Sequence, residues 1–252
     1  MSFFVALRKE LLEQWRSYRL LVVAAIFLTF GLLSPLIAKF MVEFFKLLPG
    51  GEQIAQIIPP PSVADAIAQY VKNLSQFGVI LALLLAMGAV AQEKDKGTAA
   101  MMLVKPLARG AFLGAKFAAL GLTFTFSIVL AGVGAYYYTL LLFEPLPLGG
   151  WLALNGLLLL FVLVYIALTL LCSTIARSQV VAAGLAVALV ALLGAVGALP
   201  GVGEYLPGHL LTWGAAAAGG GSGTAWPAAG VSLGIVVAAL VGAWLLFERQ
   251  EL

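Results

Sequence analysis

The sequence predicts an all-α membrane protein with six transmembrane helices, and three observations support this fold class. Hydrophobic residues make up 63% of the chain and charged residues only 10%, whereas soluble proteins are about half apolar and roughly a quarter charged. No segment alternates as the strands of a membrane barrel do, so helices must satisfy the backbone. Six apolar runs are long enough for a helix to cross a bilayer: Leu20–Ile37, Leu74–Ala91, Phe117–Phe143, Trp151–Cys172, Val180–Leu199 and Ala228–Phe247.

Residues 1–19 precede the first of these spans and predict an amphipathic helix that lies in the membrane interface. The basic residues Arg8, Lys9 and Arg16 take other directions than the apolar positions, which would place them near anionic headgroups. The alternative is a polar extension of the first span. The run that starts at Leu20 lacks a small-x-small cleavage site, so we expect a retained membrane helix. The apolar positions at helical spacing are Phe3, Phe4, Leu7, Leu11, Trp15 and Tyr18.

The distribution of basic residues predicts the orientation of the chain. All but three of the 14 lysines and arginines would lie on the side that holds both termini, the exceptions being Lys39, Lys46 and Lys72. Because basic residues concentrate on the cytoplasmic side, we expect a multi-pass cell-membrane protein with both termini cytoplasmic, in a prokaryotic inner membrane. The net charge of +3 then reflects topology, and no nucleic-acid partner is predicted.

Two longer segments are expected on the outer side of a single transmembrane domain, residues 1–252. In residues 38–73, Ser62 would cap a short helix over "VADAIAQYV", which we expect against the outer membrane surface or over the mouth of the domain. In the outer loop, residues 200–227, "YLPGHLLTWGAAAA" is apolar enough to form a re-entrant helix or a surface helix. We find no soluble domain and no convincing internal repeat.

Several kinds of chemistry are disfavoured. A Ser/His protease would need His209 and Ser222, which both fall in an outer loop rather than on packed helices. The single histidine cannot make a typical zinc site, and "GGGSG" lacks the Lys-Ser/Thr ending of a phosphate-binding loop. No ionisable residue lies in the central part of a span, which disfavours a proton-coupled carrier, although backbone carbonyls could still bind an ion. We predict no catalytic residue, cofactor or metal on this chain.

The cytoplasmic segment 92–116, "QEKDKGTAAMMLVKPLARGAFLGAK", interrupts two apolar runs with a pattern that predicts a short helix. Gly97 would turn the chain, the Thr98 hydroxyl would cap the helix, and Pro106 would end it. Residues 101–104 would present an adaptable apolar surface on a charged frame. The basic residues Lys105, Arg109 and Lys116 are expected where the chain returns towards headgroups. Such a helix would transmit force from a soluble partner; the alternative is an ordinary surface loop.

The motifs "EKDKGT", "LVKPLAR" and "GAK" in this segment resemble the cytoplasmic segment of type-2 ABC transporter permeases. The resemblance extends in order along the chain through "LRKELLEQWRSYR", "YYYTLLLF", "CSTIARSQ", "YLPGHL" and "LFERQEL". The long outer segment between the first two spans is similar to the permease subgroup associated with copper-site maturation of nitrous oxide reductase.

The resemblance implies a coupling helix at about Thr98–Val104 that docks in a groove on a separate ATP-binding subunit, which would bind ATP and magnesium. It also implies a second permease copy or a related permease, because six spans supply half of the usual pathway. The residues expected to bind the ATPase subunit are Glu93, Gly97, Thr98, Met101, Met102, Leu103, Val104, Pro106 and Arg109.

Three functions remain open at this point. The leading hypothesis is the membrane subunit of an ATP-driven exporter. The second is a mechanotransmitting or structural partner of an ABC ATPase without solute flux, and the third is an ion-coupled secondary carrier. Gly230-x-x-x-Gly234 would allow close helix packing, either within the chain or in a dimer. We expect helix-packing roles, rather than ligand contacts, for the polar span residues Thr29, Thr123, Thr125, Ser127, Asn155 and Thr169.

Overall fold

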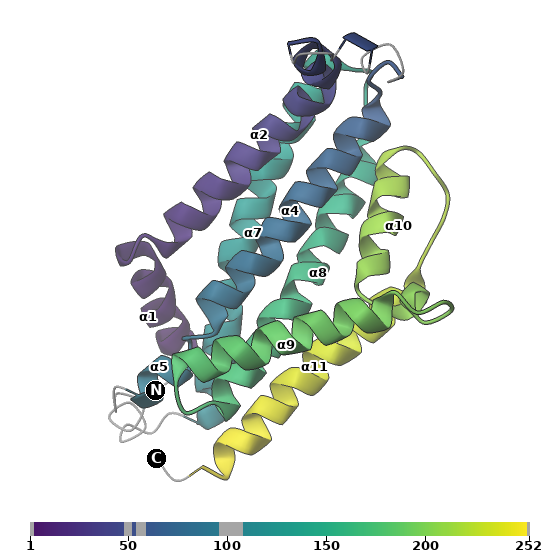
Figure 1. The fold of residues 1–252 in the computed structure, drawn as a ribbon. Helices are drawn as coiled ribbons and strands as arrows, with labels where there is room; N and C mark the ends of the chain where they lie inside the picture. Colours follow the sequence, from purple (N-terminus) through teal and green to yellow (C-terminus); the bar gives the residue numbers. More distant parts are fainter. Residues whose placement is uncertain (1–2, 48–51, 54–58, 96–107, 251–252) are drawn as a thin grey trace.

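A computed structural model describes residues 3–47, 52–53, 59–95 and 108–250 of the chain, and its elements are helices (Figure 1). Among the residues that the structure describes, six segments are long and apolar enough to cross a membrane, namely α2, α4 with its continuation to Asp95, α7, α8, α9 and α11. The prediction of an all-helical chain with six helices long and apolar enough to span a membrane is confirmed. The elements are α1 (Phe3–Arg16), α2 (Arg19–Lys46), α4 (Val63–Ala86), α5 (Ala91–Asp95), α7 (Arg109–Leu142), α8 (Leu148–Ile175), α9 (Gln179–Gly197), the 3-10 turn η1 (Gly203–Tyr205), α10 (Gly208–Ala218) and α11 (Trp226–Glu248).

Helix α1 is separate from the first span and runs across the end of the bundle, at a steep angle to α2 (Figure 1). The turn between them is made at Tyr18, which has a positive φ of 60°, a conformation that bulky residues adopt at a cost. Ala6 and Gln14 on one face of α1 are buried where the helix packs against α7. The segment that the sequence predicts as an amphipathic helix is therefore a helix with one buried face.

Helix α4 corrects the predicted outer segment. Ser62 caps it as expected: the Asp65 backbone N–H donates to Ser62 Oγ at 3.4 Å, and the Ser62 backbone N–H donates to Asp65 Oδ2 at 2.8 Å. The capped helix is not a separate surface helix, however, because it continues without a break to Ala86. Ile67, Tyr70 and Leu74 form one buried stripe at helical spacing, which packs the start of α4 into the bundle.

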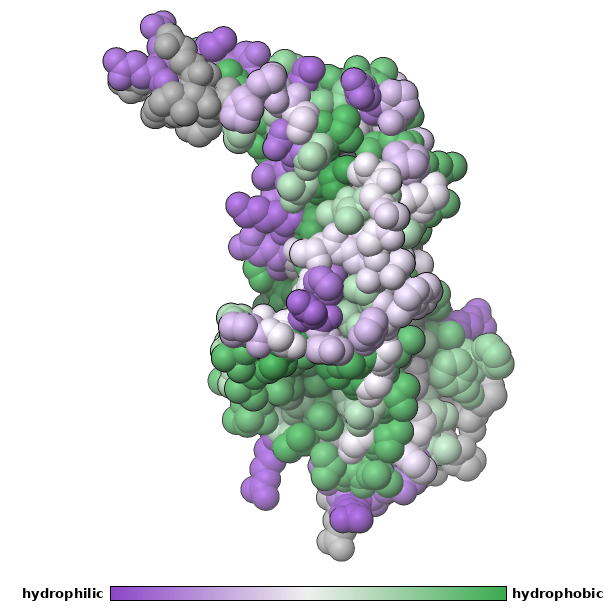
Figure 2. Space-filling view, turned by 90° about the vertical axis from the view of Figure 1, so that its right-hand side faces the viewer, coloured by the Kyte–Doolittle hydropathy of each residue, from purple (hydrophilic) through white to green (hydrophobic). Residues whose placement is uncertain are grey.

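Helix α8 is the centre of the bundle. In the most apolar 18-residue stretch of α8, 72% of the residues are buried. In the corresponding stretches of α9 and α11, 11% and 28% are buried. The last two helices therefore turn most of their surface outward, and they are tilted away from the direction of α8 (Figure 1). Figure 2 shows broad hydrophobic areas on the lower part of one face of the molecule, as expected for surface that contacts lipid tails or another membrane helix.

Helix α10 occupies the predicted outer loop and packs against α8 and α4. Its Gly214 lies against Leu154 of α8, and a side chain at Gly150 would collide with the Ala217 carbonyl of α10. The "YLPGHLLTWGAAAA" segment thus contains a helix that packs one side against the bundle, where Leu210, Gly214 and Ala218 are buried, and leaves its other side exposed. Small residues at both contacts allow the two helices to approach closely.

Polar side chains between the spans bond to one another. The Tyr70 hydroxyl donates to Asn155 Oδ1 at 2.6 Å, the Asn155 amide donates to the Trp151 carbonyl at 2.8 Å, and Trp151 Nε1 donates to the Gly132 carbonyl at 3.1 Å. This chain of bonds joins α4, α8 and α7. Asn155 therefore has the helix-packing role that the sequence suggests, because an unsatisfied amide in an apolar interior would be costly.

The closest approach of α2 and α7 is expected to depend on Gly31. A Cβ at Gly31 would lie 2.7 Å from the Ala131 carbonyl oxygen and 2.9 Å from its Cα, so backbone would have to move. We predict that Gly31→Leu lowers stability by about 1–3 kcal/mol or more, measured by thermal unfolding in detergent. The matched control is Gly184→Leu on α9, where a Cβ meets nothing within 4 Å. An equal loss in both variants would contradict this assignment.

Candidate functional site

Most of the residues predicted to bind an ATPase subunit lie outside the described residues: Gly97, Thr98, Met101, Met102, Leu103, Val104 and Pro106. The structure describes the two remaining ones, Glu93 and Arg109, which flank residues 96–107. The described part of the candidate site therefore consists of the residues that hold the chain on both sides of that segment. These residues are Glu10, Glu93, Lys94, Arg109, Lys116 and Ser173.

Ser173, near the end of α8, fixes the turn that leads into α5. Its Oγ accepts hydrogen bonds from the backbone N–H groups of Val90 and Ala91, both at 3.0 Å, and donates to the Met87 carbonyl at 2.7 Å. The side chain is fully buried. One hydroxyl thus satisfies three backbone groups that the break between α4 and α5 leaves without helical partners.

Lys94 ties α5 to the end of α8. Its Nζ donates to the carbonyl of Thr174, and to that of Ala176 at 3.3 Å. Gln250 adds a further bond from its Nε2 to the same Thr174 carbonyl at 3.1 Å. A cation at the negative end of a helix is favourable, so Lys94 both caps α8 and anchors the chain just before residue 96.

Arg109 anchors the chain just after residue 107. Its Nη1 donates to the carbonyls of Phe247, Glu248 and Gln250 at 2.6, 2.7 and 3.1 Å, and the guanidinium lies 5.7 Å from the centre of the Phe247 ring. The last carbonyls of a helix have no partner within the helix. Arg109 therefore binds the end of α11, and the start of α7 is held to the C-terminal part of the chain.

Lys116 lies at the centre of an ion-pair network. Its Nζ is 2.8 Å from Glu93 Oε1 and 3.1 Å from Glu10 Oε1, and its side chain is only 4% exposed. The expectation that Lys116 faces headgroups is wrong. The helix begins at Arg109 rather than at Phe117, so Lys116 belongs to its buried face, where α1 and α5 supply carboxylates.

Lys9 joins the same network from α1. Its Nζ is 3.1 Å from Glu10, 3.3 Å from Glu13 and 3.5 Å from Glu93. Burial lowers the pKa of Lys9, but the attraction of Glu10 and Glu93 outweighs it, so the pKa lies above its ordinary value. Lys9 is therefore charged at neutral pH and contributes a second ammonium to the cluster.

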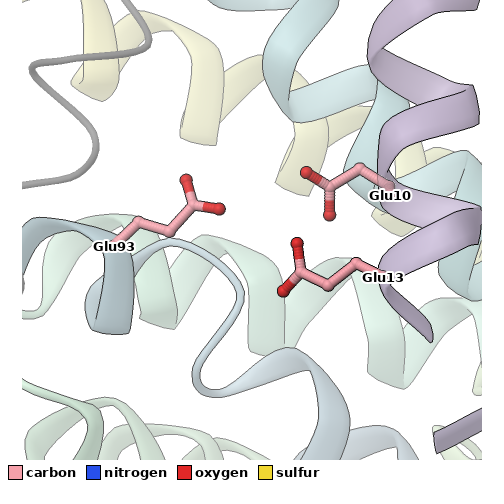
Figure 3. A group of neighbouring side chains, drawn as sticks. All are labelled: Glu10, Glu13 and Glu93. Atoms are coloured by element: carbon pink, nitrogen blue, oxygen red, sulfur yellow. The ribbon is translucent and has the colours of Figure 1, made fainter. Parts of the chain in front are cut away.

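The three glutamates of this cluster have the spacing of a metal site. Glu10 and Glu13 on α1 and Glu93 on α5 point towards one another (Figure 3), with one oxygen of each within 4.8 Å of the others. The Nζ atoms of Lys9 and Lys116 lie among these carboxylates. Two ammonium groups thus supply the countercharge that a cation would provide, so we interpret the cluster as an ion-pair network.

A polar pair further along α1 strengthens its attachment. Thr123 Oγ1 donates to Gln14 Oε1, and both side chains are buried. The sequence analysis did not identify Glu10, Gln14 or Ser173. Glu10 and Gln14 are four residues apart and therefore lie on the same side of α1, and this spacing was the available signal.

Removing the Lys116 ammonium should destabilise the protein strongly. Lys116→Met would leave the Glu10 and Glu93 carboxylates without their buried partner, and losses of this kind are about 3–5 kcal/mol. We expect unfolding in detergent to show this loss. Glu93→Gln should cost less in the Lys116→Met background than in the native protein. Lys72→Met, at an exposed position, is the control; a comparable loss there, or full additivity of the first two changes, would contradict the network.

Comparison with known proteins agrees with the arrangement of spans. Residues 5–252 match the family described as ABC-2 family transporter protein. The chain is 32% identical over 212 residues to the uncharacterized transmembrane protein YxlG of Bacillus subtilis (strain 168), covering 81% of this chain and 80% of that protein. These matches concern the broad family, and the narrower resemblance to the nitrous oxide reductase subgroup stays a prediction. The chain is a multi-pass membrane protein that belongs to the ABC-2 transporter family, as its membrane component.

Proposed function

We propose that the chain is the membrane-spanning subunit of an ATP-driven exporter, and that residues 96–107 dock on the ATP-binding subunit. ABC-2 permeases lack the ATPase domain and pair with ATP-binding subunits. One observation gives the main support. The two ends of the proposed docking segment are anchored on different helices, through Lys94 to α8 and through Arg109 to α11.

A displacement of this segment would therefore act on several spans at once. On the incoming side, Glu93 passes the motion to α7 through Lys116 and to α1 through Lys9. On the outgoing side, Arg109 passes it to the end of α11. Closure of the ATPase subunits would in this way shift the populations of two arrangements of the spans. The proposed coupling helix at Thr98–Val104 would supply the apolar contact with the ATPase.

The orientation that this function requires has both termini in the cytoplasm. The described part of the chain gathers α1, α5 and the end of α11 at one end of the bundle (Figure 1). Phe4 and Trp15 on α1 are 76% and 58% exposed, which supports an interfacial position for this helix because aromatic residues are enriched at membrane interfaces.

A second permease, either another copy or a related chain, would complete the pathway. Inside one copy, the surroundings of α8 are filled by fully buried side chains such as Leu158, Val162 and Ile166. On α11, a Cβ at Gly230 or Gly234 would meet nothing within 4 Å. No other described residue of this chain packs closely against these two glycines. They therefore remain available for close packing with a helix of a second permease, which supports a role in a dimer.

The docking assignment can be tested with two charges in the predicted apolar surface. Met101→Glu with Leu103→Glu should weaken association with the ATP-binding subunit at least about tenfold and abolish its stimulation, because carboxylates would have to be desolvated in the groove. Ser222→Glu with Thr224→Glu, in the exposed loop between α10 and α11, adds the same charge elsewhere and should bind normally. Unchanged association and stimulation in the first variant would refute the docking assignment.

The same complex separates transport from mechanotransmission. In reconstituted vesicles, an exporter should move solute or lipid when ATP is hydrolysed. ATP-dependent remodelling of a partner without flux would instead favour the mechanotransmitting alternative. Uptake driven by an ion gradient without an ATPase would favour the secondary carrier.

Orientation is testable with single cysteines, since Cys172 is buried. A membrane-impermeant maleimide should label Ser222→Cys in intact cells. It should label Thr98→Cys only after the membrane is permeabilised. The reverse pattern would exclude contact between this segment and a cytoplasmic ATPase.

A further inference from the structure

Helix α1 separates its charges onto two faces. The carboxylates of Glu10 and Glu13 lie on the side that meets α5 and α7, where Lys9 and Lys116 neutralise them. Ala6 and Gln14 are buried on that side as well. The acidic groups of α1 are thus taken up by contacts within the bundle.

The opposite face of α1 combines guanidinium groups with large apolar side chains. Phe4, Arg8, Leu12, Trp15 and Arg16 follow the four- and three-residue spacing of one helical face, and all five are exposed. Within the described part of the chain, neither arginine has a carboxylate within ion-pair distance. This face therefore presents two positive charges without an acidic partner, among aromatic and aliphatic groups.

A shallow, open groove runs along one edge of this face. It is lined by Lys9, Leu12, Glu13, Arg16 and Ser17. The Glu13 carboxylate in the groove is paired with Lys9 at 3.3 Å, which leaves the Arg16 guanidinium as the groove's uncompensated charge. Such a groove suits a group with a negative head and an apolar body.

The position of the face fits the headgroup level of a bilayer. Immediately after the turn at Tyr18, α2 begins its hydrophobic run with exposed Leu21 and Val22, which would contact lipid tails. Trp15 therefore lies next to the place where a span enters the membrane, the level at which tryptophan is enriched. Basic residues at this level are attracted to anionic lipids, whereas a zwitterionic surface gives them no such preference.

We propose that the face formed by Phe4, Arg8, Leu12, Trp15 and Arg16 binds anionic phospholipid headgroups of the adjacent leaflet. Bound lipid holds α1 against the bundle. Since Glu10 of α1 shares Lys116 with Glu93 of α5, the lipid also stabilises the anchor that precedes residues 96–107. This second effect rests on the proposed function, because its consequence is that anionic lipid improves coupling to the ATPase.

Binding can be measured on the full chain without any ATPase. The chain is placed in nanodiscs, and quenching of Trp15 fluorescence by brominated phosphatidylglycerol is compared with quenching by brominated phosphatidylcholine. Trp15→Phe gives the contribution of the other tryptophans. We expect the anionic lipid to be preferred about tenfold or more, since two basic residues contribute, and high salt should reduce the preference.

The variants locate the site. Arg8→Gln with Arg16→Gln should remove the preference. Arg177→Gln with Arg249→Gln, two exposed arginines at the same end of the chain's bundle, removes equal charge and should retain it. Equal quenching by both lipids in the native protein, or an unchanged preference in the Arg8/Arg16 variant, would overturn the lipid site.

The regulatory effect has a separate readout. With the ATP-binding subunit added, stimulated ATP hydrolysis should rise with the phosphatidylglycerol fraction in the native protein and stay flat in the Arg8→Gln/Arg16→Gln variant. A native rate that does not depend on this fraction would overturn regulation and leave the binding site intact. Failure of any ATPase to associate would instead refute the proposed function, while the quenching result would still decide the lipid site.

Discussion

The rest of the arrangement depends on one constraint, an ammonium group buried at the base of an apolar bundle. The base is the end of the bundle that holds α1, α5, the start of α7 and the end of α11. Lys116 is 4% exposed, and taking such a charge out of water is unfavourable unless carboxylates compensate it closely. Its two carboxylates come from different helices, Glu10 from α1 and Glu93 from α5. These ion pairs therefore hold both helices against α7. The same pairing fixes where the chain enters residues 96–107.

The two halves of the bundle are held together by different chemistry. At the base, ionic and carbonyl contacts join segments that are remote in sequence, as Arg109 does with the end of α11. Between the spans the contacts are uncharged, and they include close packing at Gly31 and the hydrogen bond from Tyr70 to Asn155. In an ABC-2 permease, whose family pairs with ATP-binding subunits, force from the partner would enter through the charged half. The neutral contacts above it would then distribute that force among the spans.

The features that could be predicted from the sequence are those determined by residues close to one another along the chain. The six spans follow from hydrophobic runs, and the Ser62 cap and the helix at α10 follow from residues next to one another. Lys116 could not be placed in this way, because a lone cation beside an apolar run resembles the end of a span. Its partner Glu10 is 106 residues away. Arg109 has the same difficulty, since its acceptor on Phe247 is 138 residues distant. Residues 97–106 were identified by motif and resemblance alone, so their contacts were beyond reach.

The contacts within the bundle also differ in when a growing chain can make them. Both carboxylate partners of Lys116 precede it in the sequence, so this network can close as soon as α7 leaves the ribosome. Tyr70 must wait for Asn155, and Arg109 must wait for the final residues of α11. The ion pairs of Lys116 could thus form early in synthesis, whereas the bonds from Arg109 to the end of α11 could form only after α11 has been made. A chain that stops short of the end of α11 would insert its spans and still leave the start of α7 unsecured.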